Sequence, residues 1–218
     1  MSSSSVNPQA ARGLPPDGPC LYSPCVEHLP ATPAAPVTLR VAVSADVENL
    51  AQLIQESARN LSRGFYTERE TESAIRFVFG VDSTLIEDGT YYVASLDGAL
   101  AGCGGWSRRN TLYGGDQRPM GAASLLDPSR ESARIRAFFV APRAARRGVG
   151  RRLLAQCEDA AAAAGFRSLT LMATLPGVPF YAALGFTAVE DVVDILPDGV
   201  RLPFVRMEKR VGDGERHG

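Results

Sequence analysis

The sequence predicts an α/β domain of the α+β type over residues 37–211, with a mixed, mostly antiparallel sheet and helices on both faces. Three observations support this prediction: short apolar runs typical of strands, helical periodicity between them, and an Asp97-Gly98 pair that marks a tight hairpin. The expected order is β-α-α-β-β-β-α-β-α-β-β. An order of this kind is typical of one sheet covered by helices.

The first elements follow from alternation and capping. Residues 37–43 alternate and predict a strand. A helix is expected from Ser44 to about residue 59, because acidic side chains occupy its first turn. Thr67 and Glu70 have the spacing of a capping box, so a second helix should follow and end near residue 80.

The centre of the domain contains the hairpin. Residues 90–96 and 99–107 are the two strands, because Asp-Gly supplies the positive φ angles of a two-residue turn. The glycines beside Trp106 indicate a bulge or a close approach of two backbones. A polar, glycine-rich loop follows over residues 108–132.

The C-terminal half contains the single strand-helix-strand unit, which predicts a right-handed parallel crossover. A glycine follows each of the two helices predicted in this half of the chain, as expected for a C-terminal cap. The expected elements are a strand 133–140, a long helix 147–164, a strand 168–173, a short helix 178–184, and strands 186–194 and 201–209.

Composition limits the function. A net charge of −1 disfavours an electrostatic grip on nucleic acid, and no run reaches the ~20 apolar residues of a membrane span. Residues 1–36, rich in proline and serine, and residues 212–218 predict disordered tails. The first residues lack the features of a secretory signal, so we expect a cytoplasmic protein.

Histidine and cysteine usage limits the chemistry further. His28 and His217 lie in the predicted tails, which excludes a histidine triad and a histidine-bound metal in the folded part. No metal is therefore expected. Cys103 and Cys157 fall within apolar patterns and predict buried free thiols, as in a reducing compartment.

The most informative segment is the start of the long helix. Gly148 and Gly150 follow a strand and a short loop, and they flank a first helical turn whose N–H groups have no partner within the helix. Such a turn binds phosphate, and the neighbouring arginines add charge-assisted hydrogen bonds. Leu153 replaces the third glycine of a dinucleotide motif, and a P-loop lysine is missing. A helix start with a solvated arginine face is the alternative interpretation.

Two motifs in the region 134–186 resemble the GNAT superfamily of acyl-CoA-dependent N-acyltransferases. The family signature Gln/Arg-x-x-Gly-x-Gly/Ala corresponds to Ala145, Gly148 and Gly150, although Ala145 departs from it. The later signature Phe-Tyr-x-x-x-Gly-Phe is intact at residues 180–186. The element order over residues 37–210 is also similar to that of this fold.

The resemblance implies an N-acetyltransferase that uses acetyl-CoA, and it assigns the site residues. The pyrophosphate would bind the segment made of Arg146, Arg147, Gly148, Val149, Gly150 and Arg151. The pantetheine arm would pair with Phe138, Phe139 and Val140, provided that the strand over 168–173 splays away. An N–H group of Phe139 or Val140 would stabilise the thioester oxygen, and Tyr181 would protonate the leaving thiolate.

The general base is not identified by the sequence. Where several relatives have a glutamate, this chain reads Arg134-Ile135-Arg136. Four acids are candidates for a base that deprotonates the amine through a water: Asp82, Asp116, Asp127 and Glu131. Each is also interpretable as a surface or turn residue. Arg134 and Arg136 are interpretable either as anchors for an anionic acceptor or as partners of local acids.

The acceptor is also left open. The aromatic candidates for its pocket are Phe65, Tyr66, Tyr91, Tyr92 and Trp106, of which only one or two are expected to contact substrate. The missing carboxylate supports an alternative function, a regulatory or assembly module that binds acyl-CoA without catalysis. The sequence also leaves open whether the protein forms a homodimer.

Overall fold

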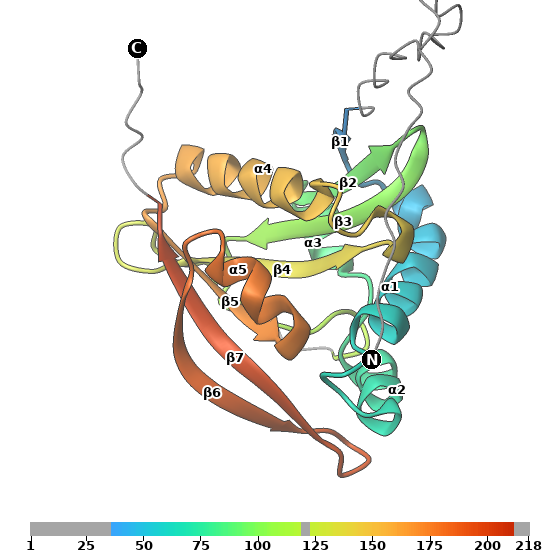
Figure 1. Cartoon of the computed structure of the whole chain (residues 1–218). Coiled ribbons are helices and arrows are strands. Elements are labelled where there is room, and N and C mark those ends of the chain that lie inside the picture. Colours follow the sequence, from blue (N-terminus) through green and yellow to red (C-terminus); the bar gives the residue numbers. More distant parts are fainter. Residues whose placement is uncertain (1–35, 119–122, 212–218) are drawn as a thin grey trace, which may run out of the picture. The chain divides into compact units, whose positions relative to one another are not determined.

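The computed structural model describes residues 36–118 and 123–211, which form a seven-stranded sheet with the strand order β1-β2-β3-β4-β5-β7-β6 (Figure 1). The predicted tails, 1–36 and 212–218, lie outside the described residues except for Pro36. In chain order the elements are β1 (Thr38–Val41), α1 (Val47–Leu61), α2 (Glu68–Phe77), α3 (Ser83–Glu87), β2 (Tyr91–Leu96), β3 (Ala99–Ser107), β4 (Ala133–Val140), α4 (Val149–Ala163), β5 (Ser168–Thr174), α5 (Val178–Ala182), β6 (Thr187–Ile195) and β7 (Arg201–Arg210).

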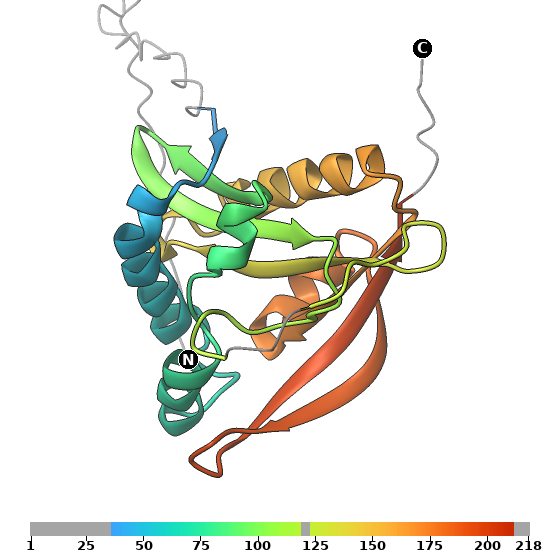
Figure 2. The ribbon, with the colours of Figure 1, turned by 180° about the vertical axis from the view of Figure 1, so that it is seen from behind.

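The sheet is antiparallel at every junction except the central one. β4 and β5 run parallel, and they pair only at Ala133 with Leu169 and at Arg134 with Thr170. Beyond these two pairs the strands diverge, so that β5, β7 and β6 turn away from β4 (Figures 1 and 2). The predicted parallel crossover and the predicted splay are both confirmed.

The hairpin of β2 and β3 has the predicted turn. Asp97 and Gly98 have φ angles of 54° and 75°, the left-handed values that a two-residue turn between twisted strands requires. The capping box is confirmed as well, because the Thr67 hydroxyl accepts a bond from the Glu70 N–H while the Glu70 carboxylate accepts one from the Thr67 N–H. These local signals were sufficient to place both elements.

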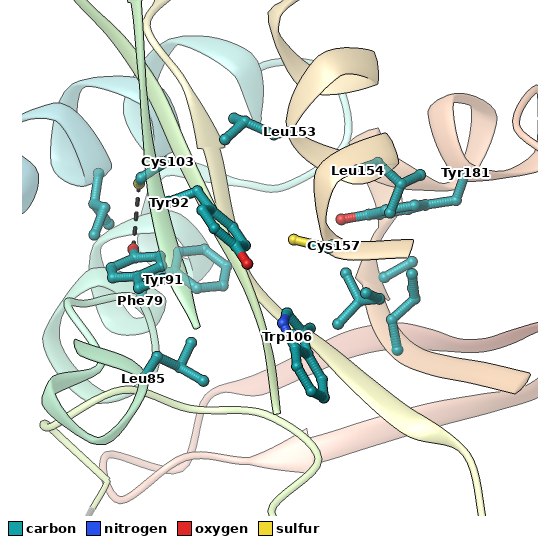
Figure 3. Packing of buried hydrophobic residues seen from close by; sticks show 14 of the residues in the cluster. Phe79, Leu85, Tyr91, Tyr92, Cys103, Trp106, Leu153, Leu154, Cys157 and Tyr181 are labelled. Carbon is teal, nitrogen blue, oxygen red and sulfur yellow. Dashed lines mark hydrogen bonds between the residues drawn. The ribbon is translucent and has the colours of Figure 1, made fainter. Parts of the chain in front are cut away.

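α4 packs on one face of β2, β3 and β4, and α3 lies against the opposite face (Figures 1 and 2). The buried side of α4 carries Leu153, Leu154 and Cys157, each almost inaccessible to solvent (Figure 3). Full burial of a leucine side chain contributes about 1.5–3 kcal/mol. Gly165, with φ of 92°, directly follows the helix C-cap, as predicted.

The N-terminal half differs from the prediction in two details. The helix α3 was not expected, because five residues are too few to show a periodic pattern; the Asp82 carboxylate caps it by accepting a bond from the Leu85 N–H. The first helix begins at Val47 rather than Ser44, after a 3-10 turn at residues 44–46. No helix within residues 36–118 and 123–211 is long and apolar enough to cross a membrane.

Candidate functional site

The site is organised by a bulge in β4, next to the point where β4 and β5 separate. The register against β3 shifts between Cys103 and Gly105, and Ala137 in the bulge has φ of 53°, a strained value for a residue with a side chain. Gly104 lies opposite, where an added Cβ would be 2.6 Å from the Phe138 ring. The bulge predicted from the glycines beside Trp106 is therefore confirmed.

A buried tyrosine on β2 contacts the backbone of the bulge. The Tyr91 hydroxyl lies 3.3 Å from the Ala137 carbonyl, to which it can donate, and 3.2 Å from the Cys103 sulfur (Figure 3). Burial raises the pKa of the Cys103 thiol to about 12, so the thiol stays protonated and unreactive. Cys103 and Cys157 are both buried and free, as predicted.

The start of α4 presents backbone donors on an open surface. Gly148 occupies the N-cap with φ of 83°, and no atom lies within 4 Å of the position its Cβ would take. The first bond toward the helix body runs from the Arg152 N–H to the Gly148 carbonyl, so the preceding N–H groups of this turn have no partner within the helix. Open space above such donors, next to Arg146 and Arg151, suits an anion.

Gly150 has a different role from Gly148. A Cβ at position 150 would lie 3.1 Å from the Phe180 ring, so glycine allows α4 to pack closely against α5. Arg146 also has a left-handed φ, of 63°, which costs strain in a residue with a side chain. The loop before α4 is thus bent at two positions, Arg146 and Gly148, within three residues.

These elements enclose a cavity of about 750 Å³. It is lined by the α1 C-terminal end, the segment before α3, the loop after β3, the diverging parts of β4 and β5, and the start of α4 with α5. Nine of the ten predicted site residues line it: Phe138, Phe139, Val140, Arg146, Gly148, Val149, Gly150, Arg151 and Tyr181.

Arg147 is the exception among the predicted site residues. Its guanidinium lies 3.0 Å from the Asp97 carboxylate in the β2–β3 turn, and Arg147 is absent from the cavity lining. Arg146, the residue before it, lines the cavity and has a left-handed φ. The sequence pattern of two adjacent arginines does not distinguish them.

Tyr181 is a residue of α5, and its ring lies among other aromatic rings. It packs edge-on against Phe138, Phe180 and Phe186, with ring centroids 5.0–6.4 Å apart. Figure 3 shows its hydroxyl directed toward Cys157 beneath α4. Burial, together with the nearby Cys157 thiol, raises the pKa of Tyr181 above its usual value. The hydroxyl therefore remains protonated at neutral pH.

Arg136 lines the cavity but is not free to bind an anion there. Its Nη2 lies 2.7 Å from an Asp82 carboxylate oxygen and donates to the Gly114 carbonyl at 2.7 Å. Both side chains are less than 7 % exposed. Burial raises the pKa of Asp82 and lowers the pKa of Arg136, and in each case it outweighs the attraction between them. The interpretation of Arg136 as the partner of a local acid is the one the structure favours.

The other candidate bases are engaged in local structure. Asp116 accepts bonds from the Ser83 N–H and hydroxyl. The Asp127 carboxylate binds Ser129, and the Glu131 carboxylate accepts the Asp127 N–H. None of the four predicted acids is part of the cavity lining. Arg134 is outside the lining as well.

Only one of the five aromatic candidates reaches the cavity. Phe65 lines it and is half exposed, whereas the other four are at most 8 % exposed in the core. Three further aromatic residues line the cavity from separate segments, and no motif in the sequence marks them as site residues: Phe79, Tyr113 and Phe204. The only signal for Tyr113 was its place in the loop after the hairpin. Within residues 36–118 and 123–211, no group of three or more histidine, cysteine or acidic side chains could hold a metal ion.

Both the sequence and the structure of the chain are similar to those of known acetyltransferases. The sequence model of the acetyltransferase (GNAT) family matches residues 50–186. A GCN5-related N-acetyltransferase from Rhodopseudomonas palustris is similar in structure, with a TM-score of 0.61, 21% identity, and coverage of 83% of this chain and 99% of the other.

Two further similar structures are described as ligand complexes. PaiA N-acetyltransferase from Thermoplasma acidophilum, in complex with coenzyme A, has a TM-score of 0.54, 18% identity, and coverage of 80% and 99%. YncA from Salmonella typhimurium, a putative acetyltransferase with acetyl-CoA, has a TM-score of 0.54, 17% identity, and coverage of 83% and 96%. At these identities the likeness shows the fold. No curated protein matches the sequence.

Proposed function

The chain belongs to the GNAT family of acetyltransferases, and on this premise we propose that it transfers an acetyl group from acetyl-CoA to an amine by direct attack. The observation that carries the proposal is the open turn at Gly148, next to a cavity that extends between the diverging strands β4 and β5. Acetyl-CoA has an anionic pyrophosphate that suits the open turn and a long, narrow pantetheine arm that suits the cavity.

The residues present suit the coenzyme. The free N–H groups at the start of α4 can hold the pyrophosphate, with Arg146 and Arg151 adding charge. Ala145, which replaces the glutamine or arginine of the family signature, removes one side-chain contact and no backbone donor. The amides of the pantetheine arm can pair with the edge of β4 that β5 leaves free beyond Arg134.

The chemistry requires few protein groups. The amine nitrogen forms a bond to the thioester carbonyl carbon, the carbon–sulfur bond breaks, and the nitrogen loses a proton while the thiolate gains one. The Tyr181 hydroxyl is the proposed donor to the thiolate, because Tyr181 lines the cavity and is protonated at neutral pH. The strained bulge at Ala137 sets the direction of the following N–H groups, of which Phe139 or Val140 is the proposed donor to the carbonyl oxygen.

The second candidate function is a module that binds acyl-CoA without transfer. It is favoured by the cavity lining, which contains no acidic side chain among the described residues. An amine that arrives as a cation finds no carboxylate there to remove its proton.

Titration calorimetry with acetyl-CoA tests the proposal first, and we expect saturable binding. Absence of binding at millimolar ligand would exclude both functions. Release of free thiol, measured with and without a panel of amines, then separates them. An acceptor-dependent increase identifies a transferase, whereas slow release that no amine stimulates favours the binding module.

A further inference from the structure

The half of the cavity away from α4 is apolar and carries no net charge. Its lining comes from α1, from the segment before α3, from the loop after β3 and from β7. Most of these side chains are hydrocarbon or aromatic: Ala58, Leu61, Phe65, Val78, Phe79, Leu112, Tyr113 and Phe204. The polar exceptions include the hydroxyl groups of Ser57 and Ser62, which are neutral.

Among the described residues, Arg136 is the one cationic side chain that lines this half of the cavity, and it is already neutralised. Arg136 forms its ion pair with Asp82 inside the protein, at 2.7 Å and with both side chains nearly inaccessible to solvent. The other arginines of the lining, Arg146 and Arg151, stand at the start of α4. No acid among the described residues lines the cavity, and residues 119–122, Pro-Met-Gly-Ala, contain no carboxylate either.

The rim of this half is apolar as well. Leu61 and Phe65 are among the few large hydrophobic side chains that are strongly exposed, at 38% and 49%, and both line the cavity. Exposed apolar groups at the rim of a cavity mark a surface that binds an apolar partner.

We propose that the acceptor is a small apolar amine whose nitrogen is weakly basic, of the arylamine type, rather than an alkyl ammonium such as a lysine side chain. This inference rests on the proposed function and specifies its substrate class. The apolar body occupies the wall between Phe65 and Phe204, and the uncharged nitrogen approaches the thioester without prior loss of a proton.

The physical reason is the cost of burying a charge without a partner. An alkylamine with the pKa of lysine, about 10.4, is neutral in roughly one molecule in 2,500 at pH 7. Its ammonium form would have to shed water into an apolar wall, where the carboxylates close by, Asp82 and Asp194, are already paired with Arg136 and Arg118. A weakly basic amine avoids that cost, and after its nitrogen bonds to the carbonyl carbon the proton passes to water.

A pair of isomers tests this without altering the protein. 4-Ethylaniline and 2-phenylethylamine have the same atoms and similar apolar bulk, but only the second is strongly basic. At pH 7 we expect kcat/KM, from thiol release with acetyl-CoA, to be at least tenfold higher for 4-ethylaniline. Between pH 6 and 8 its kcat/KM should stay flat, whereas that of 2-phenylethylamine should rise about tenfold per pH unit, in step with its free base.

A second test adds a negative charge to the rim of the cavity and compares it with the same charge placed outside the cavity. Phe65→Glu adds a carboxylate at an exposed position of the cavity, and Val193→Glu adds the same charge on β6, at a position that is 47% exposed and outside the lining. We expect Phe65→Glu to shift the kcat/KM ratio toward 2-phenylethylamine about tenfold, and Val193→Glu to leave it unchanged. Equal shifts, or none, would count against the proposal.

The result separates two kinds of failure. If 2-phenylethylamine is the better acceptor at pH 7, the substrate class is wrong while the transferase function stands. If acetyl-CoA binds and neither isomer stimulates thiol release, while other amines do, the apolar arylamine is again wrong. If acetyl-CoA does not bind, the proposed function itself fails.

Discussion

The two halves of the cavity are built in opposite ways. The half at the start of α4 comes from a few consecutive residues, and its donors are backbone N–H groups positioned by Gly148. The other half is assembled from α1, the segment before α3, the loop after β3 and β7, which are distant in the sequence. The first half depends on local conformation, and the second on side chains brought together by the fold.

This difference predicts different responses to substitution. Backbone donors survive most side-chain changes but fail when the backbone must change its φ angle. A buried ion pair tolerates no loss of one partner, because the remaining group is left buried without compensation. Substitutions at the start of α4 should therefore affect acetyl-CoA binding more than stability, whereas loss of one partner of the Asp82–Arg136 pair should affect stability first.

The largest effect is expected at Arg136. Arg136→Gln leaves Asp82 buried without its cation and should lower the free energy of unfolding by about 3–5 kcal/mol, measured by chemical denaturation. Arg59→Gln is the matched control, because Arg59 pairs with Glu72 at the same 2.7 Å but both side chains are nearly half exposed. The control should cost less than about 1 kcal/mol. Equal losses in the two variants would show that burial of the Asp82 pair is unimportant.

Tyr181 lies between the two halves and should affect turnover. Tyr181→Phe removes the proposed proton donor and should lower kcat about 100-fold, while the Kd for acetyl-CoA changes little. Tyr66→Phe is the control, because the Tyr66 hydroxyl donates to the Pro203 carbonyl and accepts the Leu175 N–H, and so has a structural role. It should cost stability rather than turnover. Wild-type turnover of Tyr181→Phe across the pH range would remove Tyr181 from the mechanism.

The smallest of these effects concerns the two glycines beside the ends of α4. Gly148 and Gly165 have φ angles of 83° and 92°, and alanine at either position meets no severe clash. Both substitutions should cost about 1–2 kcal/mol of stability through backbone strain. Only Gly148→Ala should also weaken acetyl-CoA binding, about tenfold in calorimetry. Equal affinities in the two variants would place the anion site elsewhere.

Prediction from the sequence succeeded where a signal is contained in a few neighbouring residues. The Asp97-Gly98 turn, the Thr67 and Glu70 capping box and the Gly165 position are of this kind. Prediction failed for α3, whose five residues show no periodicity. The pairing of Arg147 with Asp97, 50 positions away in the sequence, was not foreseen either.

The half of the cavity away from α4 was its least predictable part. Asp82 and Arg136 are 54 positions apart, and no spacing rule connects them. Their ion pair exists because the segment before α3 packs against β4. Likewise, the sequence identified Tyr91 as an aromatic candidate for the pocket, whereas in the structure it is a fully buried residue that supports the β4 bulge.

The sequence by itself determined the order of the elements apart from α3, the family, and the left-handed glycine at the start of α4, because these depend on local backbone preferences and on contiguous motifs. The tertiary structure alone decided that Arg136 is neutralised, that the candidate carboxylates lie outside the cavity, and that the acceptor wall is apolar. Charge and solvent exposure at a site depend on which distant segments meet there, and that is settled only when the chain has folded.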